Sequence, residues 1–165
     1  MNARISVARA ADARPIARMS RMLIEHGLPW SWTEERVLGA IRHRETAVVV
    51  ARDRRRLAGF AIMQFGDDHA HLSLLAVATG YRGLGLGRQL VDWLEACART
   101  AGLFDVRLEL RATNDAARAF YESLGYRETG SIRAYYAGRE DARRMQHELS
   151  VNPATFHDSP GFPRH

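Results

Sequence analysis

Tyr81-Arg82-Gly83-Leu84-Gly85-Leu86-Gly87-Arg88 joins two segments of different periodicity. The run before it, 72–77, is apolar and strand-like, whereas from Leu86 onward apolar residues recur at helical spacing. The first N–H groups of a helix have no intrahelical partner, and the helix dipole adds partial positive charge there. Glycines also let the backbone approach a ligand closely. The turn therefore predicts a cradle for an anionic pyrophosphate group.

The glycine spacing excludes two common phosphate-binding loops. The pattern G-x-G-x-x-G would need a glycine at Arg88 or Leu90, and a P-loop needs a lysine, which this chain lacks entirely. From Arg82 to Gly87 the residues instead follow R-x-x-G-x-G. A plain strand-to-helix connection is the alternative interpretation of this turn taken alone.

A second segment, 106–126, has a related organisation. Residues 106–110 alternate as a strand does, and Thr113 or Asn114 can cap the helix that follows. Gly125 closes that helix, and Tyr126 begins the next strand.

Together these segments resemble the two cofactor motifs of the GNAT superfamily of N-acetyltransferases, and the resemblance covers roughly residues 3–149. It implies a single α/β (α+β) domain. In that fold a central mixed, mostly antiparallel sheet is splayed at the cofactor strand, with helices on both faces and the element order β-α-α-β-β-β-α-β-α-β-β. The cofactor implied is acetyl-CoA.

The resemblance also assigns cofactor contacts. The main chain of Val77 is expected to pair with the pantetheine arm, as a strand edge does with an extended partner, and Asn114 is expected to hydrogen-bond that arm. For Asn114, a helix cap is the alternative role. The complete set of expected cofactor residues is Val77, Arg82, Gly83, Leu84, Gly85, Leu86, Gly87, Arg88, Asn114 and Ala117.

Two residues are candidates for acid–base catalysis of acetyl transfer to an amine. Tyr121 matches the family tyrosine that gives a proton to the departing sulfur, and a phenol of pKa near 10 suits a thiolate of pKa about 8.5. Glu109 lies on the strand face opposite the apolar residues and is the candidate base, directly or through water. The alternatives are a tyrosine that only packs and a solvent-facing glutamate.

The acceptor is expected to be a protein or peptide N-terminus, because four segments resemble ribosomal-protein-alanine and related N-terminal acetyltransferases. Two of them, Leu28-Pro29-Trp30 and the loop with Tyr135 and Tyr136, would clamp the start of the peptide. An α-amino group has a pKa near 8 and is neutral far more often than a lysine amine. A small amine is the alternative acceptor, with carboxylates such as Glu25 supplied to the cleft. A non-catalytic acyl-CoA-binding domain is a third possibility.

Composition bounds the remaining expectations. The chain has 165 residues, with 24 Lys+Arg and 19 Asp+Glu. It contains no lysine, so all 24 are arginine. We expect one acetyltransferase domain over 1–150, an irregular tail over 151–165, no membrane or nucleic-acid partner, and a cytoplasmic location. No metal is expected, since the histidines lack ligand spacing and His69-x-His71 reads as surface. The sequence does not indicate the oligomeric state.

Overall fold

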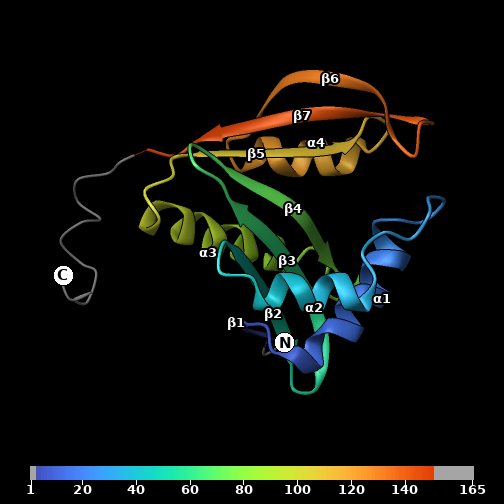
Figure 1. Ribbon diagram of the computed structural model, residues 1–165, viewed down its shortest axis with the longest axis vertical. Coiled ribbons are helices and arrows are strands. Elements are labelled where there is room, and N and C mark those ends of the chain that lie inside the picture. Colours follow the sequence, from blue (N-terminus) through green and yellow to red (C-terminus); the bar gives the residue numbers. More distant parts are fainter. Residues whose placement is uncertain (1–2, 151–165) are drawn as a thin grey trace.

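The computed structural model of the chain describes residues 3–150 and arranges them as one twisted sheet flanked by helices (Figure 1). Its strands are β1 (Ala3–Val7), β2 (Thr46–Asp53), β3 (Arg56–Phe65), β4 (Ala70–Val77), β5 (Asp105–Arg111), β6 (Arg127–Tyr136) and β7 (Glu140–Glu148). They lie in the order β1-β2-β3-β4-β5-β7-β6, with β4 and β5 parallel and the other neighbours antiparallel. The predicted mixed, mostly antiparallel sheet is confirmed. The tail predicted for 151–165 lies outside the described residues.

The helices begin and end where local signals predict. They are α1 (Ala13–Leu23), α2 (Glu34–Arg42), α3 (Leu86–Thr100) and α4 (Asp115–Ser123), with short 3-10 turns η1 (Ala10–Asp12) and η2 (Thr79–Tyr81). Thr33 Oγ1 accepts the Arg36 N–H at the start of α2, which is an N-cap bond. The α helices and strands follow one another in the predicted order β-α-α-β-β-β-α-β-α-β-β.

Each face of the sheet buries its own apolar core. On one face α3 and α4 pack on the sheet, with Leu90 and Leu94 fully buried between helix and strands. On the other face α1 and α2 cover β2 and β3, and Ile16, Val37 and Phe60 are fully buried. Burying a side chain of this size stabilises the fold by about 1.5–3 kcal/mol. The helices on both faces, which the family resemblance implies, each have a core of their own.

Two irregularities in β4 create the space for a site. Ile62 of β3 pairs with Leu74 while the adjacent Met63 pairs with Leu72, so that Ser73 is an extra residue on β4. This bulge switches the alternation, because Leu72 packs in the α3 core whereas Leu74 packs in the α1–α2 core. The pairing of β4 with β5 is confined to Ala70↔Val106 and His71↔Arg107. Beyond that point the two strands diverge, and the predicted splay is confirmed.

Candidate active site

The glycine turn between β4 and α3 has the backbone conformation that only glycine adopts readily. Gly83 has φ 76° and Gly85 has φ 82°, both in the left-handed region. Gly85 is the N-cap of α3 and has no side chain that could bond the first N–H groups of the helix. Those N–H groups and the positive end of the helix dipole remain available to an anion.

Gly87 allows α3 and α4 to meet closely. A Cβ added at Gly87 would lie 3.0 Å from Cζ of Phe120, a tight contact that the Phe120 ring could accommodate only by shifting. The third glycine of the turn therefore serves helix packing, in addition to any contact with a ligand.

A cleft of about 850 Å³ brings the glycine turn, the end of β4, the start of α4 and the end of α1 together. Most of the residues expected to hold the cofactor line this cleft: Val77, Arg82, Gly83, Gly85, Leu86, Gly87, Arg88, Asn114 and Ala117. Leu84 is not among the lining residues, and its side chain is half exposed. Tyr121 lines the same cleft, so the candidate proton donor and the glycine turn share one space.

Two polar groups at the cleft already have partners within the chain. The Val77 carbonyl accepts a hydrogen bond from Arg82 Nε at 3.2 Å. Asn114 Oδ1 accepts the Ala117 N–H at 3.1 Å, so the helix-cap role left open for Asn114 is observed. Its amide nitrogen is not used by that bond, and capping is therefore compatible with a ligand contact from the same side chain.

Tyr121 is held in the α3–α4 core, with 9% of its surface exposed. Its ring packs edge-on against Phe120 and Tyr126, at centroid distances of 5.1 and 5.4 Å. Burial raises the pKa of the Tyr121 phenol well above its ordinary value, and the nearby Tyr136 adds to that shift. The phenol is thus fully protonated at neutral pH, although its pKa lies further from that of a thiol than the ordinary value suggests.

The Glu109 side chain is enclosed on the face of the sheet opposite the α3–α4 core. The alternative that Glu109 is a solvent-facing strand glutamate is therefore wrong. Its side chain is 17% exposed, and Oε2 lies 2.5 Å from Nε2 of His71 on β4. This hydrogen bond lowers the pKa of the Glu109 carboxyl. Burial acts in the opposite direction, and the charges of His71 and Arg144 lower the pKa further. Arg144 lies directly opposite Glu109 in the β5–β7 ladder. At neutral pH Glu109 is therefore ionised.

His71, expected on the surface, is a site residue that its sequence spacing did not indicate. The His71 side chain is about one-third exposed, and Nδ1 lies 3.1 Å from Ser73 Oγ. His71 alternates with the buried Ala70 and Leu72 just as Glu109 alternates with Leu108 and Leu110. That shared alternation is the signal that could have found the pair, but it requires knowing that β4 and β5 are neighbours.

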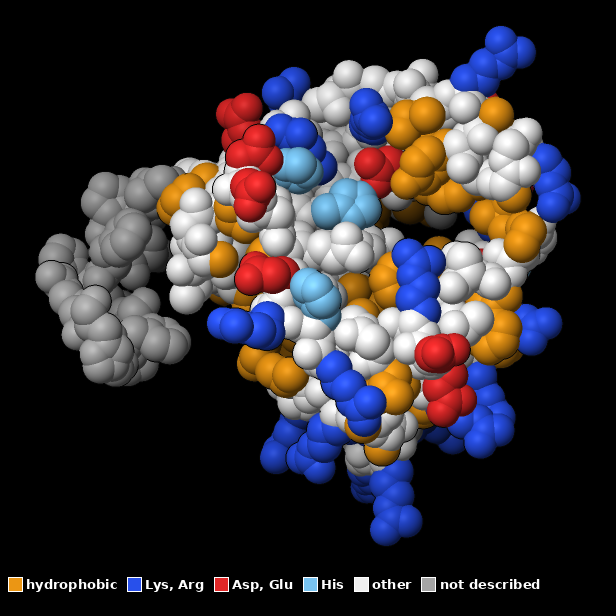
Figure 2. Space-filling view, viewed as in Figure 1, with side chains coloured by type: hydrophobic (Ala, Val, Ile, Leu, Met, Phe, Trp, Pro, Cys, Tyr) orange, Lys and Arg blue, Asp and Glu red, His pale blue; other side chains and the backbone are white. Residues whose placement is uncertain are grey.

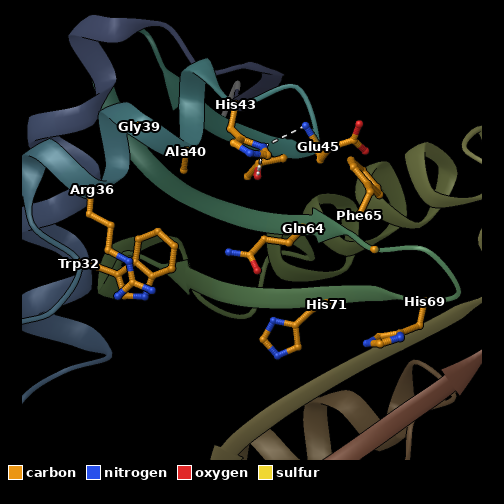
Figure 3. Close-up of a pocket in the computed structure, with 12 residues that line it drawn as sticks. Trp32, Arg36, Gly39, Ala40, His43, Glu45, Gln64, Phe65, His69 and His71 are labelled. Atoms are coloured by element: carbon orange, nitrogen blue, oxygen red, sulfur yellow. Dashed lines mark hydrogen bonds between the residues drawn. The ribbon is translucent and has the colours of Figure 1, made fainter.

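A second cavity, of about 530 Å³, lies beside His71 on the α2 side of the sheet (Figure 3). Figure 3 shows Gln64 of β3 and His71 of β4 side by side beneath α2, with Trp32 and Arg36 at one end of the cavity. The Arg36 guanidinium stacks 3.8 Å from the centroid of the Trp32 ring. His43, Glu45 and Gly66, which also line it, are exposed, so this cavity opens to solvent.

The connection between α1 and α2 carries the first of the two expected acceptor loops. Of its residues Leu28 is half-buried, Pro29 is exposed and Trp30 is 38% exposed, with the Arg21 guanidinium 5.0 Å from the Trp30 ring. The His26 carbonyl in this connection accepts a hydrogen bond of 2.6 Å from Arg111 of β5. That bond crosses the splay and fixes the loop beside the strand that carries Glu109.

The β6–β7 hairpin carries the second expected acceptor loop. Ala134 and Ala137 both have φ 53°, an unusual conformation for alanine, and they flank Tyr135 and Tyr136. Asp141 holds the first of them by accepting the Ala134 N–H at 2.8 Å. Burial raises the pKa of both tyrosines, and the negative charge of Glu109 adds to the shift. Figure 2 shows the face in view hollowed between the β6–β7 side and the α1–α2 side, with hydrophobic side chains on both rims.

Glu25 has a structural role that the sequence analysis did not anticipate. Its carboxylate accepts hydrogen bonds from Ser20 Oγ, Ser31 N, Ser31 Oγ and Trp32 N at 2.7–3.1 Å. Glu25 is therefore committed to holding the α1–α2 connection and is not a free carboxylate in the cleft, as the small-amine alternative required. Four other carboxylates that could serve a small amine, Glu34, Glu35, Asp67 and Asp68, are exposed.

Residues 3–150 contain no group of three or more His, Cys, Asp or Glu side chains placed to hold a metal ion. Within the same range, no helix is long and apolar enough to cross a membrane.

A family model, curated proteins and solved structures match this chain. A model of the acetyltransferase (GNAT) family matches residues 14–126. The chain is 39% identical to a ribosomal protein bS18-alanine N-acetyltransferase of Salmonella typhimurium over 129 residues, which are 76% of this chain and 85% of that enzyme. It is 28% identical to an N-alpha-acetyltransferase of Sulfurisphaera tokodaii over 155 residues, 86% of this chain and 90% of that one. The crystal structure of the Escherichia coli ribosomal-protein-S18-alanine N-acetyltransferase matches with a TM-score of 0.77 at 31% identity, covering 98% of this chain and 100% of that one.

Proposed function

Because this chain belongs to the GNAT acetyltransferase family and is an acetyl-CoA-dependent N-acetyltransferase, we propose that its acceptor is the α-amino group at the start of a protein or peptide. The observation that carries the proposal is a single enclosed carboxylate, Glu109, beside the splay that two apolar loops flank. The similar enzymes named above are N-terminal acetyltransferases, which agrees with this acceptor.

The described residues fit acetyl-CoA on two structural grounds. The left-handed glycines leave the start of α3 open to a pyrophosphate, and the β4 edge that faces the splay has no strand partner after His71 within residues 3–150. We assign the pyrophosphate to the N–H groups of 84–88, and the pantetheine arm to the Val77 main chain and the Asn114 amide. Acetyl-CoA supplies the acetyl group as a thioester. When the pantetheine arm pairs with the Val77 main chain, Arg82 must share or release its hydrogen bond to the Val77 carbonyl.

Glu109 and Tyr121 divide the proton transfers because their environments differ. The ionised carboxylate of Glu109 takes a proton from the incoming ammonium group, directly or through water, and so maintains a nucleophilic amine. The buried phenol of Tyr121 remains protonated and donates to the sulfur that leaves. An α-amino group suits a carboxylate of lowered pKa, since its pKa near 8 makes deprotonation far easier than for a lysine amine.

The acceptor loops are expected to bind the peptide from two sides. Leu28, Pro29 and Trp30 form one wall, and Tyr135 and Tyr136 form the other. Glu25 does not supply the small-amine alternative with a free carboxylate, because it is committed to its own hydrogen bonds.

Thiol release from acetyl-CoA tests the proposal directly. The purified protein is given peptides with a free N-terminus, the same peptides with an acetylated N-terminus and an internal lysine, and a panel of polyamines and aminoglycosides. Release of thiol is expected with the free peptides alone. Rapid turnover of the small amines, with no turnover of free peptides, would establish the alternative acceptor. If no amine supports thiol release while acetyl-CoA still binds, the non-catalytic alternative holds.

A further inference from the structure

His71 connects the Glu109 carboxylate to the second cavity. Its Nε2 is 2.5 Å from Glu109 Oε2, and its Nδ1 is 3.1 Å from Ser73 Oγ. The same imidazole lines the 530 Å³ cavity under α2, which is bordered by exposed residues. The arrangement depends on the parallel pairing of β4 with β5, because His71 and Arg107 are partners and Glu109 follows two residues later on the same face.

We propose that His71 is a positioning residue for acetyl transfer, which orients the Glu109 carboxylate and passes the proton taken from the acceptor amine to water in the second cavity. This inference rests on the proposed function, since it needs Glu109 to be the base.

The proton balance requires an exit of this kind. When the acceptor begins as an ammonium ion, a C–N bond forms, the C–S bond breaks, and the nitrogen loses two protons, of which one is matched by the proton that the sulfur gains. One further proton must reach the solvent in each turnover. A bound peptide between the two loops obstructs the route through the acceptor entrance. The imidazole offers a route on the other side of Glu109, and its two ring nitrogens can take up a proton at one side and release one at the other.

The two tautomers of His71 serve the two parts of this role. With the hydrogen on Nε2 the imidazole donates to the ionised Glu109 and positions it, and only with the hydrogen on Nδ1 can it take a proton from Glu109. A serine hydroxyl can donate or accept, so Ser73 satisfies Nδ1 whether or not that nitrogen carries a proton. With Nδ1 protonated, Nε2 is free to accept the proton from Glu109, and Nδ1 then releases its own proton toward the cavity. The ionisable groups that face this pair come from four strands or their ends. They are Arg107 and Arg111 of β5, His69 at the start of β4, Arg144 of β7, and Tyr135 and Tyr136 of β6.

Two substitutions at His71 separate packing from proton transfer. His71→Ala removes the imidazole beside a solvent-open cavity, which leaves room for added imidazole. His71→Gln preserves a polar side chain of similar reach but cannot titrate. His43→Ala is the matched control, since His43 lines the same cavity and bonds the Glu45 N–H rather than Glu109. The acetyl-CoA-dependent rise in melting temperature serves as the folding control for all three.

Both His71 variants are expected to lower kcat with a free-N-terminus peptide by up to about 10²-fold, as misplacing a catalytic group does, without changing the acetyl-CoA thermal shift. In His71→Ala the acid limb of the kcat–pH profile should move to higher pH, because Glu109 loses the bond that favours its ionised form. Added imidazole should restore the rate of His71→Ala and have no effect on His43→Ala or on Glu109→Gln.

Wild-type kcat and pH profile in His71→Gln would overturn the inference, as would a slow His71→Ala enzyme that imidazole does not rescue. The proposed function fails separately: if Glu109→Gln itself has wild-type activity, Glu109 is not the base. The double variant His71→Ala/Glu109→Gln should be no slower than Glu109→Gln alone, because both residues act in one step.

Discussion

The carboxylate of Glu25 should hold the connection between α1 and α2 in place. Removing its charge in Glu25→Gln should lower the stability of the fold by an amount that follows from the hydrogen bonds it accepts. Glu25 is 7% exposed and accepts four hydrogen bonds, two from main-chain N–H groups and two from serine hydroxyls. In Glu25→Gln the carbonyl oxygen can replace Oε1, and the new amide can donate to the Ser20 hydroxyl. The geometry is therefore retained, while bonds to a charged acceptor become bonds to a neutral one.

That exchange sets the expected size of the effect. Hydrogen bonds to charged groups contribute about 1.5–3 kcal/mol and neutral ones about 0.5–1.5 kcal/mol, and the variant no longer buries a charge. We expect Glu25→Gln to lower the free energy of unfolding by about 1–2 kcal/mol, or a fall of about 2–8 °C in Tm for a chain of this size. Glu25→Ala leaves the buried Trp32 N–H without an acceptor and should cost about 3–5 kcal/mol.

The pH dependence supplies a second measurement with a defined sign. The hydrogen bonds from Ser31, Ser20 and Trp32 together outweigh burial, which alone would raise the pKa, and so the pKa of Glu25 is lowered in the folded state. A carboxyl with a lowered folded pKa stabilises the fold fully above its unfolded pKa, about 4.3, and loses this contribution as pH falls through the folded pKa. The Tm difference between wild type and Glu25→Gln should thus be constant near neutral pH and narrow in acid.

Thermal unfolding and steady-state kinetics of the same proteins check the argument. KM for peptide should rise in Glu25→Gln because the 24–32 connection loosens, whereas the thermal shift caused by acetyl-CoA should persist. Asp67→Asn, an exposed carboxylate in the β3–β4 turn, is the control and should change stability by no more than about 0.5 kcal/mol. A Glu25→Gln protein with the Tm of wild type at pH 7, or a Tm gap that stays constant into acid, would refute the reasoning.

Three further variants test the cleft. Acetyl-CoA at a hundred times its Kd should stabilise the fold by about 2.7 kcal/mol, and Gly85→Val should abolish that shift because φ 82° is closed to a β-branched residue; an undiminished shift would contradict the cradle. Tyr121→Phe preserves the edge-on packing, so Tm should change little while kcat falls by about 10²–10⁴-fold, and an unchanged kcat would leave Tyr121 a packing role alone. Replacing Tyr135 and Tyr136 by alanine should raise KM for peptide without altering acetyl-CoA binding, and an unaltered KM would remove the hairpin from the acceptor site.

Local signals in the sequence account for the elements of this fold and for much of the cofactor cleft. The alternation of β5, the caps at Thr33 and Asn114, and the glycine turn at 83–87 each depend on residues within one element. Hydrophobic periodicity and backbone freedom are properties of short segments, so they can be read without knowledge of the partner strand. The resemblance to a known family then supplied the order in which these elements assemble.

Tertiary structure alone decided which polar side chains meet. His71 and Glu109 are 38 positions apart and touch only because β4 and β5 pair in parallel at one register before they diverge. Glu25, which the sequence offered as a carboxylate for the acceptor cleft, is buried because the chain turns back to bring Ser31 and Trp32 onto it. A strand residue shows from its own pattern which face it occupies, but not which neighbour shares that face. Neighbours are set by sheet order and register, and these depend on contacts between segments that are distant in the sequence.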